Sequence, residues 1–376
     1  MDFIWNISLV CPWDCDFCCT DAVQVQRKSN EIILRESSLS ERRVIPMGRY
    51  VPDHLRDLNI KLNAYDYALI DRQQRGLELN YSEKLEVLEN IRSKQPDIDF
   101  AGGDPLACLE NFLIIKIAKE MFGRSRISVT STGHALSRYC LQELSENIGT
   151  FEFTYDEPDS DNSQYRPDGY NAINVLWAKR IGSLGVKTKC QIPIHKDNIS
   201  SLKIRKIYQR LVEAGVDEIL IMRTFPVGRG TSFLNLQNDG LKDIDYFGAI
   251  DEYRKLERAI GGAKIKVQCA LKHLFPNSNS SNPCDLMQSS FGINSNGQLL
   301  LSAWATNSVG LPLSDDFVLG NLSKQSMETI EGTEKFLRYK QRLDENFGHC
   351  KIFSYINSHE KSENSLFMRK DPLYYS

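Results

Sequence analysis

Hydrophobic and polar positions along the chain alternate in short blocks that predict a repeating succession of strands and helices. Apolar runs rich in β-branched and aromatic residues predict six strands, at 3–10, 97–101, 126–132, 150–156, 186–194 and 218–225. Between these runs, apolar residues recur at helical spacing and predict helices at about 80–91, 107–122, 136–146, 172–184 and 202–214. The pattern therefore predicts an α/β protein.

The ends of several predicted helices carry their own signals. Asn80 and Glu83 form a capping-box pattern ahead of the stripe Leu85, Leu88 and Ile91. Gly123, Gly185 and Gly215 follow three other helices and are typical helix stops. Because strand and helix alternate six times, we expect a parallel sheet with its binding site at the carboxyl ends of the strands.

Composition narrows the class of protein. The chain has 376 residues, 41% hydrophobic and 25% charged, with a net charge of -3, which argues against a nucleic-acid-binding surface. No run reaches the roughly 18 apolar residues of a membrane span, and the start of the sequence lacks the features of a signal peptide. We therefore expect a cytoplasmic protein with neither a nucleic-acid nor a membrane partner, whose ten cysteines are reduced thiols or metal ligands.

Four cysteines crowd the stretch CPWDCDFCC at 11–19. Cys11, Cys15 and Cys18 have the spacing C-x3-C-x2-C, and three such thiolates can hold three corners of a 4Fe–4S cluster. A zinc site would need a fourth ligand nearby, and Cys19 is a poor choice because adjacent residues rarely bind one ion together. Incidental or buried cysteines are the remaining alternative.

A second motif, DIDFAGGDPL, covers residues 97–106. Here a predicted strand ends in Gly102 and Gly103, and paired glycines let a backbone approach a ligand closely. The Asp104 carboxylate beside them can accept hydrogen bonds from an ammonium group. Alone, this motif indicates only a turn.

Together the two motifs resemble those of the radical S-adenosylmethionine (SAM) enzymes. The resemblance covers about residues 3 to 350 and implies a partial (β/α)6 TIM-like barrel with a 4Fe–4S cluster on Cys11, Cys15 and Cys18. It implies that Phe17 packs over the cluster and that Asp104, where Glu is commoner, holds the SAM amino group. It also implies reductive cleavage of SAM to a 5′-deoxyadenosyl radical that abstracts hydrogen from a substrate.

The resemblance implies further SAM contacts at the later strand ends. Thr154, Tyr155 and Asp156 resemble a family segment on the fourth strand, and Arg166 lies at the spacing of a guanidinium that binds the SAM carboxylate. Each of these positions has barrel core or solvated rim as its alternative. The other candidates are Gln191 for the ribose and Met222 and Arg223 near the adenine. No catalytic residue is predicted.

The C-terminal part resembles a SPASM or twitch extension, so we expect a barrel domain at 1–262 and a small domain at 263–376. Cys284 and Gly297 fit the extension, but Ser302 and Phe353 stand where cysteines are expected. A linker is predicted at 275–283. The cysteines left to hold one auxiliary cluster are Cys269, Cys284 and Cys350. A domain without a cluster is the alternative.

The resemblance leaves the substrate open between two classes. Maturation of a ribosomally made peptide, by crosslinking, epimerisation or backbone excision, is favoured over a small-molecule oxidoreductase of the sugar or aminocyclitol dehydrogenase type. The sequence begins at the first barrel strand, so we expect no fused leader-binding domain and instead a separate leader-peptide-recognition protein, with an external electron donor. The insertion at 26–79 is too long for an ordinary loop and is either a lid or docking surface or an ordered segment without a role.

Overall fold

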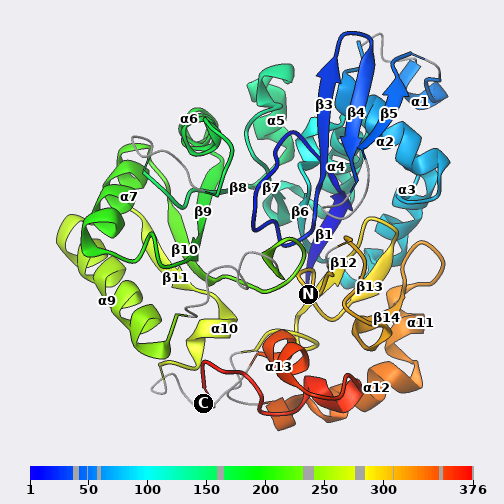
Figure 1. Cartoon of the computed structure of the whole chain (residues 1–376). Coiled ribbons are helices and arrows are strands. Elements are labelled where there is room, and N and C mark those ends of the chain that lie inside the picture. Colours follow the sequence, from blue (N-terminus) through cyan, green and yellow to red (C-terminus); the bar gives the residue numbers. More distant parts are fainter. Residues whose placement is uncertain are drawn as a thin grey trace.

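A ten-stranded sheet forms the centre of the molecule, with strand order β11-β10-β9-β8-β7-β6-β1-β12-β13-β14 (Figure 1). The computed structural model describes residues 1–36, 42–48, 50–56, 61–158, 165–231, 241–275, 284–307, 309–346 and 350–374. The strands from β11 to β12 pair in parallel, and β13 and β14 are antiparallel to their neighbours. The strands are β1 Asp2–Ser8, β6 Asp97–Gly102, β7 Ile127–Thr130, β8 Thr150–Thr154, β9 Lys187–Ile194, β10 Glu218–Arg223, β11 Lys264–Val267, β12 Ser290–Ile293, β13 Gln298–Leu300 and β14 Val318–Asn321.

Helices between the strands cover the outer face of this sheet. The strand side chains that point outward, such as Ile98, Phe100, Phe151 and Phe153, are buried in one apolar core with the helices. Burial of these side chains stabilises the fold and leaves the alternate side chains of each strand to point inward. The helices of this layer are α3 Tyr81–Asn90, α4 Leu109–Phe122, α5 Leu141–Asn147, α6 Tyr170–Gly182, α7 Ser201–Glu213 and α9 Asp243–Ile260.

The six predicted strands correspond to β1 and β6–β10, which confirms the predicted α/β fold with its large parallel sheet. The predicted capping box of α3 is also present, since Asn80 and Glu83 bond each other's backbone N–H groups. Several boundaries were wrong, since the strands predicted at 126–132, 150–156 and 218–225 end at Thr130, Thr154 and Arg223. The strand predicted at 3–10 ends at Ser8, and the helix predicted at 136–146 is a 3-10 turn followed by α5, because the backbone at Tyr139 and Cys140 is extended.

The insertion at 26–79 contains most of a second, four-stranded sheet of order β2-β3-β4-β5. Val25, Ile32, Leu34 and Ile45 of this sheet pack on Leu69 and other apolar residues of α2. The insertion is thus an ordered unit with a small core of its own beside the barrel (Figure 1). Its elements are β2 Val10–Cys11, β3 Val23–Lys28, β4 Glu31–Arg35, β5 Arg42–Pro46, α1 Asp53–Arg56 and α2 Ala64–Gln74.

The C-terminal part adds strands to both ends of the large sheet, β11 beside β10 and β12 beside β1. Strands from both sides of the predicted boundary at 262/263 therefore share one sheet, and the division into two domains stays a prediction. The predicted linker at 275–283 lies, except for Phe275, outside the described residues. The helices here are α10 Cys269–Lys272, α11 Met327–Glu331, α12 Glu334–Gln341 and α13 Lys351–Asn357. No helix in the described ranges is long and apolar enough to cross a bilayer.

Candidate active site

The segment at 11–19 that carries the four cysteines, called the cysteine loop below, lies between β2 and β3 at the carboxyl end of the barrel. It is fixed by Arg229, which follows β10 and donates from Nε to the Cys15 carbonyl at 2.8 Å and from a terminal nitrogen to Asp21 at 3.1 Å. Gly228 is required for this contact, because its φ is +54° and a Cβ atom there would lie 2.5 Å from the Cys18 carbonyl oxygen. A loop distant in sequence thus holds the cysteine loop in place.

The three cysteines of the motif line one cavity, which also contains Cys19. Burial raises the pKa of Cys11 and Cys15. Burial also opposes ionisation of Cys18, but the Arg229 guanidinium and hydrogen bonds from the Thr20 hydroxyl and backbone N–H groups outweigh it and lower the pKa of Cys18. The Ala22 N–H lies 3.4 Å and the Thr20 hydroxyl 3.5 Å from the Cys18 Sγ.

This sulfur-rich donor set, with hydrogen bonds to one thiol, suits an iron–sulfur cluster in its chemistry. The thiols do not surround a common centre, since no group of three or more His, Cys, Asp or Glu within the described residues is arranged to hold a metal ion. Assignment of a cluster to Cys11, Cys15 and Cys18 stays a prediction.

Gly102 and Gly103 lie where the barrel approaches the cysteine loop, and both line the cavity. The Gly103 N–H donates to the Ser8 carbonyl at 2.7 Å, and a Cβ atom at Gly103 would lie 2.3 Å from the Val10 carbonyl oxygen. The glycines therefore permit close packing of β6 on the segment that leads to Cys11.

Asp104 is fully buried, and its carboxylate points into the protein. One oxygen accepts the Ser131 hydroxyl at 2.8 Å and the Leu106 N–H at 3.1 Å, and the other accepts the Thr132 hydroxyl at 2.6 Å. Burial raises the pKa of Asp104, although the two hydroxyls favour its ionised form. Unlike Gly103, Asp104 is not among the residues that line the cavity, so the structure uses it to position Ser131 and Thr132, and its contact with an ammonium group stays a prediction.

Arg166 and Asp156, which were both predicted to contact SAM, form an ion pair with each other. Arg166 donates from Nε and a terminal nitrogen to one Asp156 oxygen, at 2.9 and 2.7 Å. Its guanidinium carbon lies 4.2 Å from the centre of the Phe17 ring and 4.7 Å from that of Tyr170. Arg166 and Phe17 both line the cavity, whereas Asp156 is completely buried behind them.

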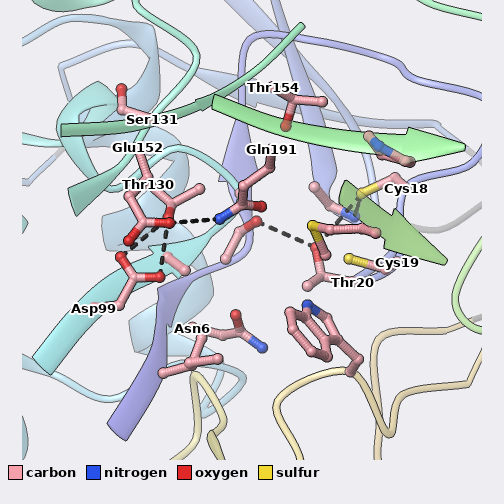
Figure 2. Close-up of a pocket in the computed structure, with 18 of the residues that line it drawn as sticks. Asn6, Cys18, Cys19, Thr20, Asp99, Thr130, Ser131, Glu152, Thr154 and Gln191 are labelled. Atoms are coloured by element: carbon pink, nitrogen blue, oxygen red, sulfur yellow. Dashed lines mark hydrogen bonds between the residues drawn. The ribbon is translucent and has the colours of Figure 1, made fainter. Parts of the chain in front are cut away.

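The cavity has a volume of about 420 Å³ and extends from the cysteine loop to the floor of the barrel (Figure 2). The predicted residues Thr154, Gln191, Met222 and Arg223 also line it. The Gln191 amide nitrogen donates to Glu152 at 2.8 Å, and its contact with a ribose stays a prediction. Arg223 is held by Asp371 at 2.7 and 2.8 Å.

Sequence reasoning missed the polar groups of the barrel floor, Asp99, Glu152 and Lys189, which line the same cavity. The available signal was the alternation of polar and large apolar residues in DIDF and TFEFT, which places the polar side chains on one face of each strand and the apolar side chains on the other. A strand inside a barrel needs no polar inward face unless that face meets solvent or a ligand, so these residues belong with the candidate site.

The three C-terminal cysteines come together in space. Burial, followed by the charges of Cys284 and Cys350, raises the pKa of Cys269, and burial together with Asp371 and Cys284 raises the pKa of Cys350 to about 12. Lys351 donates from Nζ to the Cys284 Sγ at 3.3 Å. No group of three or more possible ligands within the described residues is arranged to hold a metal ion, and an auxiliary cluster on Cys269, Cys284 and Cys350 stays a prediction.

Comparison with known proteins bears on the fold alone. No protein-family model and no curated protein matches the sequence. SuiB of Streptococcus suis bound to S-adenosylmethionine is similar in structure, with a TM-score of 0.66 and 14% identity over 100% of this chain and 77% of that chain. Polyhistidine-tagged anSMEcpe with bound AdoMet has a TM-score of 0.59 and 14% identity over 98% of this chain and 93% of that chain. These likenesses confirm the predicted architecture, and the chain has the fold of SuiB and anSMEcpe.

Proposed function

We propose that this protein is a radical SAM enzyme that modifies a peptide. The observation that carries the proposal is the convergence of Cys11, Cys15, Cys18, Gly103 and Arg166 on one cavity at the carboxyl ends of the barrel strands. This is the place where parallel α/β folds bind ligands. All of these residues except Arg166 belong to the two motifs that resemble those of the radical SAM family.

Cys11, Cys15 and Cys18 would hold a 4Fe–4S cluster with one open iron. When bound and reduced, the cluster supplies the electron that cleaves SAM and so starts radical chemistry at an unactivated carbon. Arg166, already oriented by Asp156 and stacked on Phe17, would bind the SAM carboxylate by charge-assisted hydrogen bonds. The enclosed barrel excludes water from the reacting groups.

A peptide substrate is supported by structures of two similar proteins. SuiB has been solved bound to its precursor peptide SuiA, with a TM-score of 0.58 to this chain. The structure of anSMEcpe with AdoMet and the Cp18Cys peptide has a TM-score of 0.59. Both are 13–14% identical to this chain, so the peptide is part of the proposal, as are a separate leader-recognition protein and an external electron donor.

The first test measures 5′-deoxyadenosine formed from SAM and dithionite by the anaerobically reconstituted protein. The variant Cys11→Ala/Cys15→Ala/Cys18→Ala should form none, and Cys19→Ala, which alters a neighbouring thiol of the same cavity, should retain the activity. Equal cleavage by the triple variant would refute the cluster assignment.

Coexpression with a candidate precursor peptide, followed by mass spectrometry, tests the substrate. A peptide unchanged in mass and stereochemistry, together with oxidation of a small alcohol, would favour the oxidoreductase.

A further inference from the structure

The floor of the barrel carries a group of polar side chains, of which only Gln191 is also a predicted SAM contact. They point inward from neighbouring strands, and Figure 2 shows Asp99, Thr130 and Glu152 across the cavity from Cys18 and Cys19. The group consists of Asn6 on β1, Asp99 on β6, Thr130 on β7 and Glu152 on β8, with Lys189 and Gln191 on β9. Its members differ in how many hydrogen-bond and ion-pair partners the protein itself supplies.

Glu152 is fully partnered. Lys189 Nζ lies 3.0 Å from one of its oxygens and 2.9 Å from the other, and the Gln191 amide donates to it at 2.8 Å. An ammonium and an amide therefore neutralise and bind this carboxylate. Lys189 in turn is committed to Glu152, with a further attraction to Asp99.

Asp99 is poorly partnered by comparison. Both its oxygens share the single hydroxyl of Thr130, at 3.0 and 2.9 Å. Within the described ranges no cation lies at ion-pair distance from Asp99. Burial, and then the negative charge of Glu152, raise the pKa of Asp99 to about 7, against the opposing attraction of Lys189. Asp99 thus faces the cavity with unused capacity to accept hydrogen bonds.

Asn6 supplies a second, independent acceptor. Its side chain is 2% exposed, and its amide nitrogen donates to the Ala303 carbonyl at 3.1 Å. Its amide oxygen accepts no hydrogen bond from any part of the chain that the structure describes, and the residue lines the same cavity. Asn6 and Asp99 lie on adjacent strands, and Figure 2 shows both at the cavity floor. The Asn6 amide oxygen is therefore an acceptor that a ligand in the cavity can use.

We propose that Asp99 and Asn6 bind a protonated primary amine of the substrate, such as a lysine side chain. An ammonium group has three donors and no acceptor, which complements two groups with unused capacity to accept hydrogen bonds. With Asp99 ionised, the three charged groups of the floor sum to one negative charge, and one cation balances it. When the amine binds to protonated Asp99, the Asp99 proton leaves to solvent. The inference rests on the proposed function only in taking the cavity as the substrate site.

The test compares two probes on the cluster-loaded protein with SAM and without reductant: N-acetyl-lysine methylamide and its neutral analogue N-acetyl-norleucine methylamide. We expect the wild-type protein to bind the lysine probe at least about tenfold more tightly, and Asp99→Asn to lose that preference. Infrared difference spectra at pH 6 should show loss of a protonated carboxyl band when the lysine probe binds, and this band should be missing in Asp99→Asn. Glu89→Gln is the control, because Glu89 is a carboxylate in an exposed ion pair with Arg92, away from the cavity.

Two outcomes would overturn the proposal. The first is equal affinity of the wild-type protein for both probes, and the second is an unchanged preference or band in Asp99→Asn. Because no SAM is cleaved in this experiment, its result is independent of radical chemistry. A protein that cleaves SAM but does not discriminate between the probes refutes only the amine site. One that discriminates but does not cleave SAM refutes only the proposed function.

Discussion

Arg223 lies flat against Phe353, with its guanidinium carbon 3.4 Å from the centre of the ring. Phe353 stands where a cluster-bearing SPASM domain is expected to have a cysteine, and it also packs on Phe225 at 5.3 Å between ring centres. Phe353 thus connects α13 to the end of β10 by aromatic contacts. At this point the C-terminal segment is joined to the barrel by packing.

This contact predicts a large effect of Phe353→Ala on stability. Phe353 is buried, and its removal leaves a cavity and exposes the guanidinium of Arg223, so we expect a loss of about 3–5 kcal/mol in the free energy of unfolding. Denaturant titration measures it. The control Leu337→Ala removes an exposed apolar side chain from α12 and should change stability by less than about 0.5 kcal/mol. Similar values for the two variants would contradict the packing role.

The same region should hold no iron. Lys351 contacts the Cys284 thiol, and Ser302 and Phe353 supply no thiolate, so we expect the Cys11→Ala/Cys15→Ala/Cys18→Ala variant to contain almost no iron after reconstitution. Iron and sulfide analysis measures this, with the wild-type protein as reference. About four irons per chain in the variant would instead establish one auxiliary cluster, on Cys269, Cys284 and Cys350.

Arg229→Lys should destabilise the conformation of the cysteine loop. The substitution removes the fork that joins Cys15, Ala22 and Asp21, and it leaves a buried carboxylate imperfectly paired. We expect a loss of about 3 kcal/mol or more in stability and reduced iron content after reconstitution. Arg92→Lys, in an exposed ion pair with Glu89, is the control and should change neither quantity. Normal iron content in Arg229→Lys would show that the loop holds its shape without this contact.

Arg166→Ala should lower the affinity for SAM. Loss of a charge-assisted contact to the SAM carboxylate costs about 1.5–3 kcal/mol, which calorimetric titration of the reconstituted protein detects. Arg180→Ala removes a guanidinium that lies on Trp177, away from the cavity, and should bind SAM normally. If Arg166→Ala also binds SAM normally, another residue holds the carboxylate.

Asp99 should make stability depend on pH. Its pKa is raised to about 7 in the folded protein from a usual 3.8, so the folded state binds more protons than the unfolded state between these values. Stability from this group is therefore lost as pH rises from about 4 to 7. Compared with wild type, Asp99→Asn should gain relative stability between pH 5 and 8. Denaturant titrations across this range measure the difference, and parallel curves for the two proteins would exclude a raised pKa.

Local patterns predicted the strands and the cysteine loop because their signals lie within a few residues. The small sheet was missed although Val23 and Val25 alternate with polar residues, and the apolar run Ile32–Leu34 follows in a hairpin pattern. The orientation of Asp104 could not be predicted, since it depends on hydroxyls of Ser131 and Thr132 from another strand. The same holds for Asp99, whose environment is made by Glu152 and Lys189 from two further strands.

The contact between Thr306 and the cysteine loop constrains the order in which the protein matures. The Thr306 hydroxyl donates to the Cys19 carbonyl, 287 residues away in sequence, and the Thr306 carbonyl accepts the Gly228 N–H at 3.1 Å. Contacts of such long range form late in folding, after the intervening chain has been ordered. On the ribosome, the thiols made first are therefore enclosed only when residues near 306 have emerged.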